Sequence, residues 1–289
     1  MIRTALRHHA PTEVAEAVAL LDIHADRAAV LAGGTMLVPS LTRGERDLDH
    51  VIDLRRLGVD AATVTADSVH IGAMVTYAQL LARSAFPGTA QLLQRVAGAI
   101  TGGPQIRCQG TICGSAAYAN PSSEVPAVLV ALDATMHLHG PGGARMIPAA
   151  AFFLDAYTVD LRRGELLTGV TVAARAARLG YYKLKLAEGS WPIATAAAVL
   201  PPTDGGYGDV GYRGAVVTLG AISTRPIQLE LAPVLDDDGR LPSDADVDDW
   251  VVAQIGETWD DELAPGDYRS MVAGVVLRRA LHRAREENR

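Results

Sequence analysis

A glycine-punctuated polar segment, residues 107–115 (RCQGTICGS), carries the residue types best suited to chemistry in this chain. Gly110 and Gly114 permit positive φ and let the backbone approach a ligand closely. Thr111 and Ser115 add hydroxyls, and the turn presents free backbone N–H groups, which suits a phosphate or pyrophosphate. Short glycine motifs often match by chance, so the alternative interpretation is that this segment is an ordinary loop before a helix.

A carboxylate follows this turn at Glu124, near the start of a predicted helix. Ser122 or Ser123 is the expected cap of that helix. Apolar residues spaced i, i+3, i+4 and i+7 should anchor it in the core: Val125, Val128, Leu129 and Leu132. The segment thus combines a phosphate-binding turn, a carboxylate and a helix that holds both in place.

A second glycine turn lies far upstream, in residues 31–37 (LAGGTML). It follows a short apolar strand predicted over residues 28–32, and a strand that runs into a glycine turn can present N–H groups to a phosphate. The turn lacks the lysine of a P-loop, and its glycines do not match the dinucleotide-binding fingerprint. The pair of turns, more than either turn alone, therefore favours a phosphate-bearing ligand.

Other candidate groups have ordinary structural explanations beside functional ones. For Cys113, a small buried residue is favoured over a redox centre. The ordinary interpretation of Lys183 is a solvated strand residue, and that of Trp191 is a residue packed in the core. His137 and His139 share a strand face and are candidate metal ligands. Because no third ligand lies nearby in the sequence, a solvated strand face is favoured for this pair.

Two matches to known motifs lack the structural context that those motifs need. Residues 206–211 read Gly-x-Gly-x-x-Gly, but a strand follows instead of a helix, which predicts a hairpin turn. Asp244, Asp246 and Asp248 resemble the start of a calcium loop. Asp249 replaces the obligatory glycine, so charge at a helix N-terminus is the better explanation. No Gly-x-Ser-x-Gly, Cys-x-x-Cys or His-Glu-x-x-His motif is present, so the chemistry must come mainly from a bound cofactor.

The composition excludes several classes of protein. The chain has 289 residues and is 49% hydrophobic, enough for two domains and a sizeable core. Its net charge of −7 and pI of about 5.6 argue against a nucleic-acid partner. No apolar run is long enough to span a bilayer, and the N-terminus lacks the apolar region of a secretory signal. With two cysteines in one loop, a reducing cytoplasm is the expected location.

The hydrophobic pattern predicts α/β units followed by antiparallel strands and two C-terminal helices. Helices are expected over residues 11–23, 76–81, 89–100, 244–258 and 267–286. Strands are expected over residues 28–32, 50–54, 135–138, 145–147 and 165–172, and as a pair within 63–75. Further antiparallel strands are expected in residues 181–200 and 212–222, after a basic, alanine-rich connector. The change from α/β units to antiparallel strands at this connector predicts a domain boundary near residue 178.

Taken in order, these stretches resemble the flavin-binding medium subunit of the molybdenum hydroxylases, the family of carbon monoxide dehydrogenase and xanthine dehydrogenase. The A-G-G-x-x-L motif of that family is matched at residues 32–37, and I-R-x-x-G-T-I-G-G-[NS] at residues 106–115. Further family motifs match at residues 126–134, 152–153, 165–168, 181–183 and 268–281. The resemblance covers nearly the whole chain, and the two glycine motifs together make it specific.

The resemblance implies an α+β fold. A p-cresol methylhydroxylase-type FAD-binding domain would span residues 1–178, in two α/β subdomains of about 1–56 and 57–178. A C-terminal domain of antiparallel strands and helices would span residues 179–289. The resemblance also implies a set of residues that hold a non-covalent FAD: Leu31, Ala32, Gly33, Gly34, Thr35, Met36, Leu37, Thr101, Thr111, Ile112, Cys113, Gly114, Ser115, Tyr118, Glu124, Leu167, Lys183 and Trp191.

Roles follow from the same resemblance. The two glycine turns would hold the pyrophosphate and ribityl region, and Glu124 would accept hydrogen bonds from cofactor hydroxyls. Lys183 would lie near the flavin. Cys113 departs from the first glycine of the family's G-G pair, and Gly103 stands where many members have histidine. Residues 186–187 replace an arginine pair, and the cysteine-rich loop that some members carry for an extra iron–sulfur cluster is absent.

The implied function is electron transfer. Substrate would be hydroxylated at molybdopterin in a large partner subunit, and electrons would pass through [2Fe–2S] clusters of a small partner subunit. They would reach FAD on this chain and then an external acceptor, within a dimer of heterotrimers. One alternative is a stand-alone flavoprotein oxidase or reductase of the same fold. Another is a protein that has lost its flavin, against which the intact glycine turns argue. No catalytic residue or metal ligand is expected on this chain.

Overall fold

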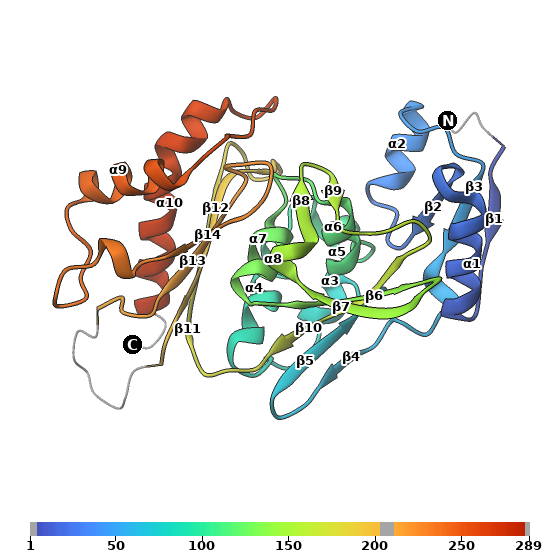
Figure 1. Ribbon diagram of the computed structural model, residues 1–289, viewed down its shortest axis with the longest axis horizontal. Coiled ribbons are helices and arrows are strands. Elements are labelled where there is room, and N and C mark those ends of the chain that lie inside the picture. The colour runs from blue at the N-terminus through green and yellow to red at the C-terminus, as the bar shows by residue number, and fades with distance from the viewer. Residues whose placement is uncertain (1–4, 203–210, 287–289) are drawn as a thin grey trace.

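The computed structural model describes residues 5–202 and 211–286, and its N-terminal part is a small α/β unit (Figure 1). A parallel sheet has the order β1-β3-β2. Its elements are β1 (Arg7–His9), α1 (Val14–His24), β2 (Ala28–Leu31), α2 (Leu37–Arg43) and β3 (His50–Asp53). The helix α1 buries Ala17 and Val18, and the first glycine turn joins β2 directly to α2.

The middle part is a five-stranded antiparallel sheet with the order β4-β5-β10-β6-β7, covered by helices. Its strands are β4 (Ala62–Val64), β5 (Ser68–Gly72), β6 (Thr135–Gly140), β7 (Gly143–Pro148) and β10 (Leu166–Ala173). Its helices are α3 (Tyr77–Leu81), α4 (Gln91–Ala99), α5 (Gly103–Arg107), α6 (Ile112–Tyr118), α7 (Glu124–Ala131) and α8 (Ala149–Phe152). The short strands β8 (Phe153–Asp155) and β9 (Thr158–Val159) pair beside them. Alternate residues of β6 are buried, as expected for a strand that covers a core with one face.

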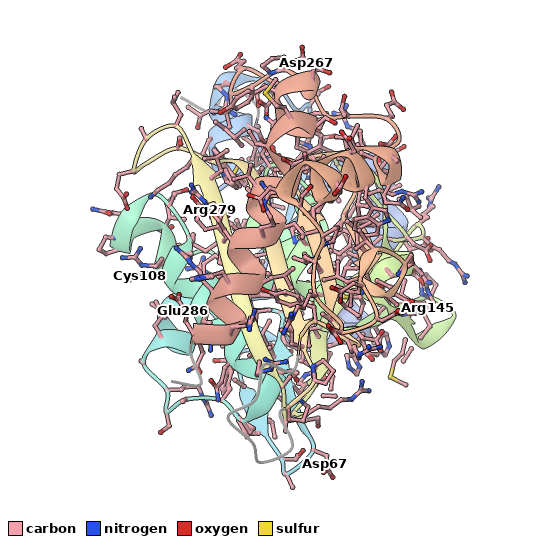
Figure 2. The ribbon with its side chains drawn as sticks, turned by 90° about the vertical axis from the view of Figure 1, so that its left-hand side faces the viewer. Asp67, Cys108, Arg145, Asp267, Arg279 and Glu286 are labelled. Atoms are coloured by element: carbon pink, nitrogen blue, oxygen red, sulfur yellow. The ribbon has the colours of Figure 1, made fainter. Side chains whose placement is uncertain are left out.

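The C-terminal part is a four-stranded antiparallel sheet covered on one face by two helices. The strands β11 (Arg178–Lys185), β12 (Pro192–Leu200), β13 (Val216–Gly220) and β14 (Ile227–Glu230) are neighbours in chain order. The helices are α9 (Asp244–Gln254) and α10 (Gly266–Glu286), and α10 lies along β11 and β12 (Figures 1 and 2). Gly180 allows this close packing, because a Cβ there would lie 1.8 Å from the carbonyl oxygen of Ala280.

Helix α7 joins the middle and C-terminal parts. It packs against α4 and α6 on one side and against β12 and β13 on the other. The sequence pattern predicted one apolar face, but every residue of α7 is buried, including Ala127 and Val130 outside the predicted stripe. Apart from Glu124, α7 is apolar on every side because it is enclosed on all sides, so periodicity alone did not show which of its residues are buried.

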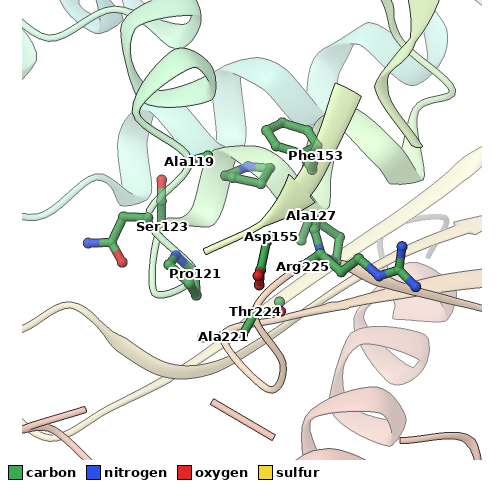
Figure 3. A pocket seen from close by; sticks show the side chains of 13 residues that line it. Ala119, Pro121, Ser123, Ala127, Phe153, Asp155, Ala221, Thr224 and Arg225 are labelled. Carbon is green, nitrogen blue, oxygen red and sulfur yellow. The ribbon is translucent and has the colours of Figure 1, made fainter. Parts of the chain in front are cut away.

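The packing between α7 and the C-terminal sheet is close. Figure 3 shows the cavity at this contact, lined among others by Pro121, Asp155 and Thr224. Its volume is about 10 Å³, which is room for roughly one water molecule. The cavity is therefore excluded as a cofactor site.

Most of the predicted elements are confirmed within a few residues, including the strand pair, the β6–β7 hairpin and both C-terminal helices. The expectation of one continuous turn over residues 107–115 is wrong, because α5 ends at Arg107 and α6 begins at Ile112. The hairpin predicted for residues 206–211 lies outside the described residues, apart from Gly211. The main core clusters draw on residues 17–197 and 194–284, and the first includes Leu179 and Tyr181, so the proposed domain boundary near residue 178 stays a prediction.

Thr76 and Gln79 close the start of α3 with a reciprocal capping box. Replacing Thr76 by alanine is expected to lower the free energy of unfolding by about 1 kcal/mol, because the Gln79 N–H loses its acceptor. Urea unfolding measures this, and Thr76→Ser should stay close to the wild type. Equal stability of the alanine variant would show that the box contributes nothing.

Candidate functional site

The two glycine segments lie against each other. A Cβ at Gly33 would lie 2.0 Å from the carbonyl oxygen of Gln109, so only the hydrogen of glycine fits there. A Cβ at Gly114 would lie 3.9 Å from the Cβ of Ala32. Residues 31–37 and 107–115, distant in the sequence, thus form one continuous surface.

The glycines of the second segment serve close approach and not unusual backbone geometry. Gly34 has a φ of +70°, but neither Gly110 nor Gly114 lies in the left-handed region, so these two positions do not use the positive φ that glycine permits. A Cβ at Gly110 would lie 2.9 Å from the Tyr77 ring, and one at Gly114 would lie 2.8 Å from Thr111 Oγ1. Glycine is therefore required here by neighbouring atoms.

Both segments run into the start of a helix. Thr111 caps α6, because its Oγ1 accepts a hydrogen bond of 2.9 Å from the Gly114 N–H. The N–H groups of Ile112 and Cys113, in the first turn, have no carbonyl partner within the helix. The residues that join β2 to α2, residues 32–36, are all partly exposed. N–H groups at a helix start without a carbonyl partner are the groups that bind phosphate oxygens.

Tyr77 supports this surface from behind and was not predicted from the sequence. Its hydroxyl lies 2.5 Å from Ser115 Oγ, and its N–H donates to the carbonyl oxygen of Gly110 over 3.0 Å. Burial raises the pKa of Tyr77 above its ordinary value, so the phenol stays neutral. The sequence predicted only the helix over residues 76–81 that contains Tyr77, and not its contact with residues 107–115.

Cys113 is buried beneath the surface, with 2% of its area exposed. Burial raises the pKa of the Cys113 thiol to about 12, which disfavours the reactive thiolate. The interpretation of Cys113 as a small buried residue is confirmed.

This burial predicts a difference between the two cysteines. Cys108, at the margin of the face in Figure 2, is exposed, whereas Cys113 is buried. With a thiol-specific reagent at pH 8, one thiol per chain should react quickly in the native protein and the second only after denaturation. Cys108→Ser should abolish the fast reaction. Fast labelling of that variant would contradict the buried position of Cys113.

A larger cavity of about 600 Å³ opens between residues 98–103 and β11. Its lining brings together Thr101 and Lys183, as the sequence predicted. Gly102 and Gly103 have φ values of +91° and +72°, which lets the loop turn sharply beside the cavity. The charged side chains of the lining are mainly basic: Arg107, Lys183, Lys185 and Arg283, with Glu188 as the acidic member. The cavity therefore suits an anionic ligand.

Lys183 and Glu124 form a buried ion pair at one side of this cavity. Lys183 Nζ lies 2.7 Å from Glu124 Oε1 and donates to the carbonyl oxygen of Ala99 over 2.6 Å. The side chains are 8% and 1% exposed, so the solvated interpretation of Lys183 is wrong. The proposed contact of Glu124 with cofactor hydroxyls stays a prediction, because here its Oε1 accepts from Lys183.

Tyr181 adds an unpaired polar atom to the same cavity. Its hydroxyl is buried and has no hydrogen-bond partner among the described residues. Burial raises the pKa of Tyr181 well above its ordinary value, so the hydroxyl remains a neutral donor. A buried hydroxyl without a protein partner beside a cavity marks a place for a polar atom of a ligand or for a water molecule.

Leu167, Tyr118 and Trp191 belong neither to the two glycine segments nor to the cavity lining. Leu167 is buried in β10 with 4% of its area exposed. Tyr118 is exposed at the end of α6, and its ring lies 5.3 Å from that of Tyr157. Trp191 is partly exposed directly before β12. Their contact with a cofactor stays a prediction.

The histidines considered as metal ligands lie on a strand face of the middle sheet. His137 Nε2 and His70 Nδ1 both bond to Thr171 Oγ1, at 2.7 and 3.0 Å, on a half-buried strand face. Among the described residues, His137 and His139 belong to no group of three potential metal ligands.

Ser243 caps α9, and Asp244 and Asp246 lie in its first turn, so the explanation as helix N-terminal charge is confirmed.

Residues 4–174 match the family model described as "FAD binding domain in molybdopterin dehydrogenase". The chain belongs to this family, and it is an FAD-binding oxidoreductase subunit of the molybdenum hydroxylase type. No helix in the described residues is long and apolar enough to cross a membrane.

Several known proteins are similar to this chain over nearly its whole length. The carbon monoxide dehydrogenase medium chain of Afipia carboxidovorans is 33% identical over 290 residues, which cover 99% of this chain and 98% of that one. The corresponding chain of Hydrogenophaga pseudoflava is 31% identical over 287 residues, 98% of each chain. In the structure of reconstituted CO dehydrogenase from Oligotropha carboxidovorans, the matching chain has a TM-score of 0.87 and 33% identity. That match covers 98% of this chain and 99% of the other. The recognition of the family and of the α+β fold from sequence is confirmed.

Proposed function

We propose that this chain transfers electrons within a larger complex, receiving them from [2Fe–2S] clusters of a small subunit and delivering them to an external acceptor. A molybdopterin-binding large subunit would hydroxylate the substrate. The main observation behind this proposal is the close contact between Gly33 and Gln109, which joins the two glycine segments into one surface for a cofactor. The relatives are named as medium chains of carbon monoxide dehydrogenase, which supports large and small partner subunits. We place the complex in the cytoplasm as a dimer of heterotrimers.

The residues present fit FAD. The segments 31–37 and 107–115 each lead into the first turn of a helix, and N–H groups at a helix start suit a pyrophosphate. The basic cavity beside Thr101 and Lys183 suits the remaining, polar part of the cofactor, with the unpaired Tyr181 hydroxyl as a donor. When bound, FAD supplies reversible electron uptake and release.

In this proposal, the residues of this chain bind the cofactor and hold the binding surface in position. The buried pair Lys183–Glu124 ties β11 to the start of α7, so the cavity wall and the helix keep a fixed relation. Tyr77 holds Ser115 and Gly110 in place behind the binding surface. Around this surface, the described residues place no nucleophile beside a base and no metal cluster suited to breaking a substrate C–H bond.

The isolated chain tests this proposal. Acid or heat denaturation should release free FAD into the supernatant, because no covalent attachment is proposed. Under anaerobic conditions, purines, nicotine-like heterocycles, aldehydes and carbon monoxide should leave the flavin absorbance of the purified chain unchanged. Bleaching should appear when the large and small subunits and their own substrate are added.

The second candidate function, a stand-alone flavoprotein, predicts the opposite result. It rests on the open cavity of about 600 Å³, which leaves room for a substrate as well as for part of a cofactor. Rapid bleaching of the isolated chain by one of these substrates would favour it and would contradict electron transfer as the sole role.

A further inference from the structure

Three histidines from three separate elements converge in the N-terminal α/β unit. They are His9 on β1, His24 at the last residue of α1 and His50 on β3. Among the described residues, they form the group whose potential ligand nitrogens all lie within 4.8 Å of one another. The proposed FAD site includes none of them, since we build it from the glycine segments and the cavity beside β11.

The rings are closely associated. His9 Nε2 lies 2.8 Å from His50 Nδ1, and the His24 and His50 rings stack with centroids 3.5 Å apart and planes inclined by 10°. A hydrogen bond between two ring nitrogens requires one of them to act as an acceptor, so at least one ring is neutral. A neutral imidazole nitrogen is also the form that binds a metal ion.

We propose that His9, His24 and His50 bind a divalent late first-row transition ion, for which Zn²⁺ is the probe. Zinc–nitrogen bonds of about 2.0–2.1 Å in a tetrahedral site place ligand nitrogens about 3.4 Å apart. The 2.8 Å contact between His9 and His50 would have to open, and the widest separation, within 4.8 Å, would have to narrow. The stacked His24 and His50 rings would also have to turn out of their nearly parallel arrangement, because a metal ion lies close to the plane of each imidazole that binds it. His9 and His24 are partly exposed, which leaves room for this rotation, and three histidines leave a fourth position for water.

The surroundings agree with such a site. His50 is 8% exposed, whereas His9 and His24 are partly exposed and leave an approach from solvent. An all-nitrogen set disfavours magnesium and calcium, which take oxygen ligands. The ion would tie β1 and the end of α1 to the central strand β3.

The matched control lies one residue away. His8 is also on β1, but its Nε2 bonds to Asp53 Oδ2 at 3.0 Å, and it does not belong to the cluster. Adjacent residues of a strand point to opposite faces of the sheet. His8→Gln thus removes an imidazole from the same strand without changing the proposed site.

The experiment titrates Zn²⁺ into the tag-free, FAD-loaded chain by calorimetry. One ion per chain is expected in the wild type and in His8→Gln. His9→Gln and His24→Gln should each lower the affinity by at least about tenfold, because loss of even an outer-shell partner of a ligand usually costs about 10–100-fold. Co²⁺ should give absorption bands of a four-coordinate site in the wild type, and His9→Gln should lose them.

Two results would overturn the proposal. One is equal Zn²⁺ affinity in the wild type, His9→Gln and His24→Gln, which would place any binding elsewhere. The other is an equal loss in His8→Gln, which would indicate non-specific binding to β1. Circular dichroism and FAD content of each variant show whether it is folded, and His9, which is partly exposed, is the substitution least able to disturb the core.

Discussion

Replacement of Lys183 by methionine is expected to lower the free energy of unfolding by about 3–5 kcal/mol, because it leaves a buried carboxylate without its partner. The side chain of Glu124 is 1% exposed, and its Oε1 accepts a 2.7 Å hydrogen bond from Lys183. Methionine keeps most of the volume of the lysine stem, so the change is mainly the loss of charge. Urea unfolding of the FAD-depleted variant measures the effect without any contribution from cofactor release.

An exposed ion pair on the same strand is the control. Lys185 lies 2.6 Å from Glu188, whose side chain is 96% exposed, so Lys185→Met should change stability far less. Combining Lys183→Met with Glu124→Gln should recover part of the loss, since the isolated charge is then removed. If Lys183→Met cost no more than Lys185→Met, the pair would not stabilise the junction between β11 and α7.

Local sequence signals predicted much of this fold and part of the site. Capping residues, apolar alternation and turn glycines act within a few residues, so they placed the β6–β7 hairpin, the short helix after Thr76 and the strand before Gly33. Glycine-rich segments also marked both halves of the binding surface. The family resemblance was needed to connect these halves, because local patterns do not state which distant segments meet.

The missed features depend on contacts between distant residues. The ion pair of Glu124 with Lys183 forms across the junction of two parts of the chain, so each residue alone resembled an ordinary charged side chain. The start of α6 was missed because Gly114 is a poor helix former. The cap at Thr111 and the packing of Ile112 and Cys113 in the core outweigh that preference. The cluster around His50 draws on three elements and leaves no local spacing to recognise.

Replacement of Gly33 by alanine is expected to weaken FAD binding by at least about tenfold, or about 1.4 kcal/mol. The new Cβ would lie 2.0 Å from the carbonyl oxygen of Gln109 and 2.7 Å from its carbonyl carbon. Both are backbone atoms, so no side-chain rotation can relieve the overlap, and the two glycine segments must separate. Fluorescence titration of FAD into the deflavinated variant measures the affinity.

Gly142→Ala is the matched control for this prediction. No atom lies within 4 Å of a Cβ at Gly142, and its φ is not in the left-handed region, so the same chemical change should leave FAD affinity unaltered. Circular dichroism should show that both variants are folded. If Gly33→Ala bound FAD as tightly as Gly142→Ala, the contact between the two segments would not shape the cofactor site. The pyrophosphate would then have to be held elsewhere, for example along the basic cavity beside Lys183.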